Sequence, residues 1–72
     1  MKANGEYIIL KCEGIILDAT KNKGKIISKG EATSNRLKVG EEVLFQKGDN
    51  FTHNGEEYVA VNSRDILAIL GE

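Results

Sequence analysis

The sequence predicts a small all-β protein, folded as a mostly antiparallel β-barrel. Short apolar segments recur with strand-like alternation, and no segment keeps a helical period for longer than one turn. The 72 residues include eight glycines and no proline, which suits a chain that bends often. Asn54-Gly55 is the dipeptide best suited to a type I′ hairpin turn, because both residues tolerate positive φ. We therefore expect about five or six short strands in one domain spanning residues 1–72.

The predicted strands are short runs rich in apolar residues, and glycines or polar clusters separate them. In chain order we expect a strand at Glu6–Cys12, an apolar triplet at Ile15–Leu17, a loop at Asp18–Lys23, a strand at Gly24–Lys29, a polar connection at Gly30–Arg36, a strand at Glu42–Gln46, and a hairpin of Asp49–His53 with Glu56–Asn62. In the first strand Ile8, Leu10 and Cys12 share the expected core side.

The chain closes with a second apolar run that needs a sheet to join. Ser63-Arg64-Asp65 breaks the alternation of the hairpin strand, and Ile66–Leu70 follows as a run of five apolar residues. A chain of this size buries only about 60% of its unfolded surface. Disulfides and metals, the usual reinforcements of small domains, have no support in the sequence. We therefore expect oligomerisation to supply part of the stability.

Composition argues against several partners. A formal net charge of −1 and a pI near 5.8 give no electrostatic reason to bind nucleic acid or an anionic membrane. The apolar runs are too short to span a bilayer, and residues 1–7 lack the apolar segment of a signal peptide. Cys12 is the only cysteine and is best interpreted as a small buried hydrophobe at a strand end. We expect a cytoplasmic protein.

Few residues suggest catalysis. His53 is the only histidine, and it lies beside the hairpin turn, where we expect exposure. Histidine and cysteine are too few for a zinc site. Glu41-Glu42 and Glu56-Glu57 are adjacent carboxylates, whose side chains point to opposite faces of a strand. The glycines of GKIISKG (24–30) lack the Lys-Ser/Thr of a phosphate loop. We expect neither an enzyme nor a cofactor.

Motifs in both halves of the chain match one family pattern in order and spacing. They are EYIILK (6–11), GIIL (14–17), GKIISKG (24–30), LKVGEEVLF (37–45) and EEYVAVNSRDILAIL (56–70). Together they resemble the GroES family of small co-chaperonins. GIIL resembles the glycine and hydrophobic triplet of the family's mobile loop. The closing motif, with its Asp-Ile-Leu-Ala-Ile ending, is the most specific of the five.

The resemblance implies a subunit of a heptameric, homo-oligomeric ring that caps a large GroEL-type chaperonin and assists protein folding. ATP is bound by the large partner, which agrees with the missing phosphate loop. The chaperonin contacts implied by position are Gly14, Ile15, Ile16 and Leu17. In the family, the first strand of one subunit pairs with the closing strand of its neighbour. The matching interface positions are Tyr7, Ile8, Ile9, Leu10, Ile66, Leu67, Ala68, Ile69 and Leu70.

Two connections are shorter than in the family pattern. Only Cys12 and Glu13 separate the first strand from Gly14, and the connection that forms the roof of the dome is cut to about residues 31–36, without an aromatic tip. A second hypothesis is therefore a GroES-like structural or interaction module that does not bind a chaperonin. In that case Ile15–Leu17 is another core strand, with Gly14 as a bulge.

A third hypothesis is a small nucleic-acid-binding barrel. Lysines at positions 21, 23, 25 and 29 cluster in the sequence, and Phe51 or Tyr58 offers a ring for stacking on bases. Acidic residues balance the basic run, and lysines in a loop more often form a solubilising surface, so this is the least favoured of the three hypotheses.

Overall fold

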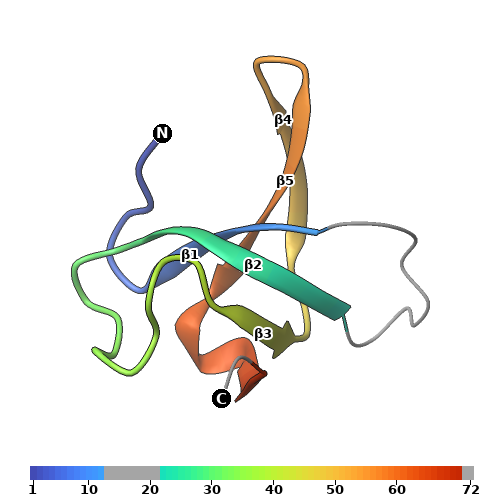
Figure 1. Ribbon diagram of the computed structural model, residues 1–72. Coiled ribbons are helices and arrows are strands. Elements are labelled where there is room, and N and C mark those ends of the chain that lie inside the picture. The colour runs from blue at the N-terminus through green and yellow to red at the C-terminus, as the bar shows by residue number, and fades with distance from the viewer. Residues whose placement is uncertain (13–21, 71–72) are drawn as a thin grey trace.

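The computed structural model describes residues 1–12 and 22–70. Six strands form one antiparallel sheet in the order β4-β5-β1-β2-β3-β6 (Figure 1). The elements are β1 (Tyr7–Lys11), β2 (Asn22–Lys29), β3 (Glu42–Phe45), β4 (Asp49–His53), β5 (Glu56–Asn62), the 3₁₀ helix η1 (Ser63–Asp65) and β6 (Ile66–Ile69). The part of the chain that the structure describes has no α-helix. The predicted all-β, antiparallel class is confirmed.

The hairpin of β4 and β5 has the predicted bounds and turn. Asn54 and Gly55 adopt φ of 52° and 79°, the left-handed pair that a type I′ turn requires. The hairpin extends away from the rest of the molecule (Figure 1). Local turn chemistry therefore sets the register of this pair, in which Phe51 faces Tyr58.

β2 starts earlier than expected. It begins at Asn22, inside the stretch that the sequence predicts as a loop, because Asn22 and Lys23 pair with Phe45 and Leu44 of β3. Polar residues are acceptable there, since a strand needs only one apolar face and Lys23 is exposed. The loop prediction was wrong for these two residues, because their strand conformation depends on pairing with β3, which lies more than 20 residues away in the chain.

The sheet curls around one core. Its buried side chains are Ile8, Leu10, Ile26, Leu37, Val43, Phe45, Val59 and Val61. The register shifts at two places, leaving Ile27 of β2 and Leu67 of β6 as extra residues. Such bulges bend a strand and increase its twist, which lets a short sheet wrap around its own apolar face. The sheet ends at β4 and β6, and no pairing joins these two strands within the described residues.

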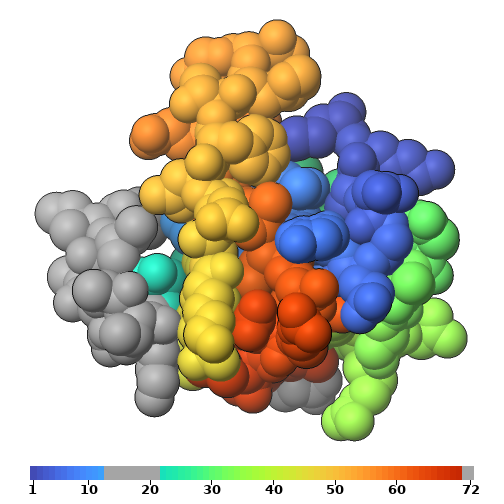
Figure 2. Space-filling view, turned by 180° about the vertical axis from the view of Figure 1, so that it is seen from behind, coloured from blue at the N-terminus to red at the C-terminus, as the bar shows by residue number. Residues whose placement is uncertain are grey.

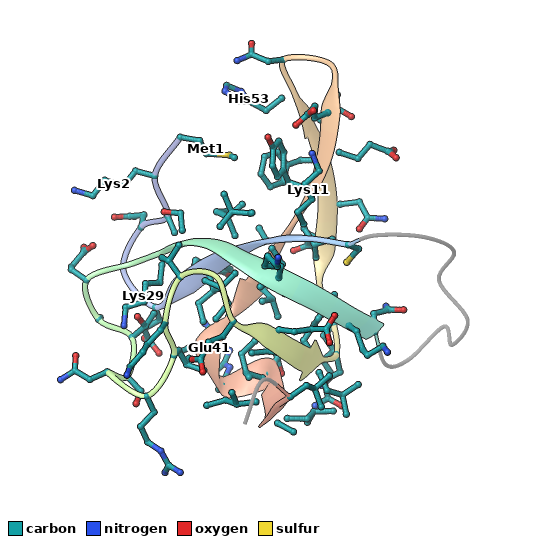
Figure 3. All side chains as sticks on the ribbon, viewed as in Figure 1. Met1, Lys2, Lys11, Lys29, Glu41 and His53 are labelled. Atoms are coloured by element: carbon teal, nitrogen blue, oxygen red, sulfur yellow. The ribbon has the colours of Figure 1, made fainter. Side chains whose placement is uncertain are left out.

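The polar connection after β2 is tied down by a lysine. Lys29 Nζ donates to the carbonyls of Leu37 at 2.6 Å and Ser34 at 3.0 Å, and Figure 3 shows its side chain beside this connection. Leu37 is buried in the core, and Gly40 N–H donates to the Ile26 carbonyl at 2.8 Å. The connection thus covers one side of the core instead of only joining two strands.

The N-terminal residues fold back against the start of this connection. Ala3 N–H donates to Ser28 Oγ at 3.0 Å, and Ala32 N–H donates to the Gly5 carbonyl at 3.0 Å. A Cβ atom added at Gly30 would lie 2.1 Å from the Gly5 carbonyl oxygen. Gly30 is therefore required because two backbone segments approach each other closely there.

We expect Gly30→Ala to lower the free energy of unfolding by about 1–3 kcal/mol, since the added methyl group forces the N-terminal backbone to move. Urea denaturation followed by far-ultraviolet circular dichroism measures the change. Ala32→Ser, at an exposed neighbouring position, is the control and should stay within about 0.5 kcal/mol of the wild type. Equal stability of Gly30→Ala and the wild type would contradict the close approach.

Candidate functional site

The predicted chaperonin contacts Gly14, Ile15, Ile16 and Leu17 lie outside the described residues. The structure does describe the strands that flank them. β1 ends at Lys11 and β2 begins at Asn22, and the two strands are antiparallel neighbours whose last pair is Lys11 with Lys25. The segment that holds the predicted contacts therefore connects two adjacent strands of the sheet.

β6, which carries most of the predicted C-terminal interface, is an edge strand. Among the described strands it pairs with β3 alone, where Ile69 faces Val43 and Ala68 faces Leu44. Leu67 and Leu70 are 43% and 40% exposed, respectively. An apolar strand with one unpaired backbone edge is a ready template for pairing with another chain. The geometry therefore suits the predicted interface role of Ile66–Leu70.

A corner of three residues directs β6 to this edge. Asn62 caps η1, since its side-chain oxygen accepts from Arg64 N–H at 3.0 Å. Ser63 N–H donates to the Glu6 carbonyl at 2.8 Å, and Gln46 N–H donates to the Asp65 carbonyl at 3.0 Å. These bonds tie the corner to the residue before β1 and to the residue after β3. The break in alternation at residues 63–65 is thus a fixed turn that carries the chain across to β3.

An open groove of about 870 Å³ lies between β6 and the connection that precedes β3. Its lining residues are Ser34, Asn35, Arg36, Leu37, Lys38, Glu41, Ser63, Ile66, Leu67, Ala68 and Ile69. Arg36 and Lys38 are exposed, so the groove combines cationic and apolar side chains. No motif in the sequence links Arg36 or Lys38 to the C-terminal run, because only the fold brings these distant segments together.

β1 differs from β6 in that both of its edges are already occupied. It pairs with β5 on one side and β2 on the other. Ile8 and Leu10 are fully buried in the core and Ile9 is 7% exposed, whereas Tyr7 is 46% exposed. A strand of a neighbouring subunit cannot pair with β1 while β1 is hydrogen-bonded to both β5 and β2. The interface role of Tyr7–Leu10 stays a prediction, and Tyr7 is the member whose side chain is accessible.

A cluster of contacts joins β1, β5 and β4 on the outer face of the sheet. Lys11 Nζ lies 2.6 Å from Glu56 Oε2 and 5.4 Å from the centroid of the Tyr58 ring. The Tyr58 hydroxyl donates to Glu56 Oε2 at 3.1 Å. The Tyr58 ring stacks on Phe51, with centroids 5.7 Å apart and planes 28° apart. Figure 3 shows Lys11 reaching toward the hairpin.

Three groups in and beside this cluster have shifted pKa values. The hydrogen bond from Lys11, then the one from Tyr58, lowers the pKa of Glu56. The same contact raises the pKa of Tyr58, because its hydroxyl must keep the proton that it donates to Glu56. Partial burial raises the pKa of the Cys12 thiol, which packs against the core. Cys12 therefore resembles the predicted small hydrophobe more than a reactive thiolate.

Three of the residues that suggested nucleic-acid binding have partners in the chain. Phe51 and Tyr58 stack on each other, and Lys29 donates to two backbone carbonyls. Lys23 and Lys25 are exposed on β2, and Lys21 lies outside the described residues. Two of the features behind that hypothesis are thus accounted for by contacts within the fold.

His53 is exposed, as predicted, and its Nε2 lies 3.3 Å from Asn54 Nδ2. Within residues 1–12 and 22–70, no three histidine, cysteine or acidic side chains gather as a metal site would require. The same residues contain no helix with the length and hydropathy needed to cross a bilayer.

Comparisons with known proteins point to one family. The family described as "Chaperonin 10 Kd subunit" matches residues 11–70. A protein of Bifidobacterium longum subsp. infantis named "Co-chaperonin GroES" is 46% identical over 50 residues, which are 67% of this chain and 52% of that protein. A protein of Phocaeicola vulgatus with the same name is 35% identical over 65 residues, which are 79% of this chain and 72% of that protein.

A third similar protein, from a Geobacillus species and also named "Co-chaperonin GroES", is 33% identical over 51 residues. The match covers 68% of this chain and 54% of that protein. The chain thus spans about half the length of its Bifidobacterium and Geobacillus relatives.

We expect Lys11→Met to return the pKa of Glu56 toward its ordinary value of about 4.3, because the largest cause of the lowering is lost. Titration of the Glu56 carboxyl by NMR measures this change. A lowered pKa in the folded state means that the contact stabilises the fold above the ordinary pKa. That contribution disappears as the pH falls through the lowered value.

Lys23→Met, which removes another exposed lysine, is the control for this titration and should leave it unchanged. The same Glu56 curve in the wild type and in Lys11→Met would contradict the cluster.

Proposed function

The chain belongs to the chaperonin 10 kDa subunit family, and on that premise we propose that it is a co-chaperonin subunit. It assembles with identical chains into a ring, caps a large GroEL-type chaperonin and assists protein folding. The observation that carries this proposal is the family match over residues 11–70, which includes β2 to β6 and the end of β1. The chain itself performs no catalysis and binds no cofactor, ATP is used by the large partner, and both act in the cytoplasm.

The partner contact is proposed for Gly14, Ile15, Ile16 and Leu17. Burying one branched apolar side chain contributes roughly 1.5–3 kcal/mol, before the cost of ordering the segment. One such triplet binds weakly, whereas several triplets presented by one ring act with a high effective concentration. The flanking strands support this role, because β1 and β2 are neighbours in the sheet and bring both ends of the segment to one place.

The ring contact is proposed mainly for β6. Its free edge and its exposed Leu67 and Leu70 are the features of a strand that another chain completes. β1 contributes through Tyr7, whose side chain is accessible, while Ile8–Leu10 support the interface from within the fold. A closed heptamer is the assembly that the family resemblance implies, and a head-to-tail contact of this kind forms a ring when its rotation closes.

We expect Leu17→Asp to abolish binding to a purified GroEL-type chaperonin in the presence of ATP, because the contact then buries an unpaired charge. Co-sedimentation and the chaperonin's ATPase rate measure the effect. Leu17→Met, which keeps an apolar side chain of similar volume, is the control and should bind. If the wild type neither binds nor alters ATP turnover, the chain is instead a structural or interaction module of the same fold.

We expect Leu67→Lys to reduce the oligomeric mass at micromolar concentration, since a lysine on an edge strand opposes pairing with another chain. Multi-angle light scattering measures the mass. Val39→Lys is the control, because Val39 is also an exposed aliphatic residue, at 61%, and lies outside the groove and β6. A strictly monomeric wild type would count against the ring, and an unchanged mass for Leu67→Lys would count against the β6 interface.

A further inference from the structure

Lys11 is held on the outer face of the sheet at the end of β1. Its Nζ contacts Glu56 Oε2 at 2.6 Å and lies over the Tyr58 ring, and Tyr58 donates to the same carboxylate oxygen. Phe51 supports the Tyr58 ring from β4. Two side chains of β5 thus hold the ammonium group of the last residue of β1, which reaches toward the hairpin (Figure 3), and β4 supports them through Phe51.

Cys12, the next residue, is held on the inner face. Its side chain packs against the core cluster. A Cβ atom added at Gly24 would lie 3.3 Å from Cys12 Sγ, 3.3 Å from Phe45 Cε1 and 3.2 Å from Leu10 Cβ. The missing side chain of Gly24 therefore leaves the space that Cys12 and Phe45 occupy.

We propose that Lys11 and Cys12 form an anchor that positions the start of the segment carrying Gly14–Leu17, with Glu56 and Tyr58 as its outer positioning residues. This role rests on the proposed function. Lys11 and Cys12 come shortly before Gly14 in the chain, and they are fixed from opposite faces of the sheet. The cluster is thus assigned a positioning role because it holds the end of β1, from which the segment continues.

The anchor lowers the cost of partner binding by limiting fraying where the segment leaves the sheet. Fixing the backbone of each residue costs conformational entropy when binding orders it, and residues that are already fixed in the free chain do not incur that cost again. Each subunit of a ring repeats this gain, so a small effect in one chain multiplies in the assembly. A variant that removes the anchor contacts and leaves the core intact should therefore lose more affinity for the partner than stability of the fold.

The anchor also extends to the β4–β5 hairpin. Glu56 and Tyr58 lie near the start of β5, and Phe51 lies in β4. The hairpin rises from the body of the molecule (Figure 2, yellow to orange). Tyr58 lies under Lys11 and Phe51 stacks on Tyr58, and these contacts give both aromatic rings of the exposed hairpin a partner.

The first experiment measures fraying of the anchor with Cys12 as the probe. We compare the rate at which a thiol reagent labels Cys12 in the wild type, in Glu56→Gln and in Glu57→Gln. Cys12 is only partly accessible in the fold, so labelling of its thiolate becomes faster when fraying exposes the side chain further. We expect Glu56→Gln to label about two- to fivefold faster, a size typical of losing one exposed charged contact. Glu57→Gln removes the same charge from the opposite face and should label as the wild type does.

The pH dependence of labelling separates two causes. A change in the pKa of the Cys12 thiol shifts the rate profile along the pH axis, whereas greater exposure raises the rate at every pH. A uniform rise confined to Glu56→Gln supports the anchor. Equal rates in the wild type and Glu56→Gln, or a shift along the pH axis alone, would overturn it.

The second experiment measures the affinity of the same three proteins for a purified GroEL-type chaperonin with ATP. We expect Glu56→Gln to bind at least about twofold more weakly, with Glu57→Gln unchanged and with all three proteins fully folded at the temperature of the binding assay. If labelling rises but affinity stays the same, the positioning role is wrong. If labelling rises and even the wild type fails to bind, the proposed function fails while the anchor as a structural device is retained.

Discussion

The structure depends on β1 being hydrogen-bonded along both edges. β5 and β2 flank it, and its buried Ile8 and Leu10 lie at the centre of the core. Each such side chain contributes roughly 1.5–3 kcal/mol by its burial, so the two ladders and the core reinforce one another. With β1 in the middle, the remaining strands must extend outward in both directions. Within residues 1–12 and 22–70, the sheet therefore ends at β4 on one side and at β6 on the other.

These two edges differ in chemistry. β4 exposes Asp49, Asn50, Thr52 and His53, which solvate an edge well, whereas β6 exposes Leu67 and Ala68. A polar edge discourages pairing with another chain and an apolar edge invites it. The strand order within one subunit thus explains why we propose the β6 edge, and not the β4 edge, for the contact between subunits. The outer-face cluster lies on β1, β4 and β5, away from β6, so the anchor and the ring contact that we propose would use separate regions of a small molecule.

Several features followed from residues close together in the chain. Asn54-Gly55 predicted the hairpin correctly because its turn depends on two φ angles. Alternation in the first strand identified Ile8 and Leu10 as core residues, since side chains of a strand point to alternate faces. Other features required distant residues. Asn22 and Lys23 look like a loop until β3 pairs with them, and Ile9 is buried although it faces away from the core.

The sequence by itself determined the all-β class, the turn and the membership of a family, because each is encoded in local conformational preference or in a contiguous motif. Only the tertiary structure decided which strands have free edges, why Gly30 must lack a side chain, and that Lys11 meets Glu56 and Tyr58. These outcomes depend on contacts between residues far apart in the chain, 45 positions in the case of Lys11 and Glu56. Spacing along the sequence carries no information about such a contact until the sheet order is known.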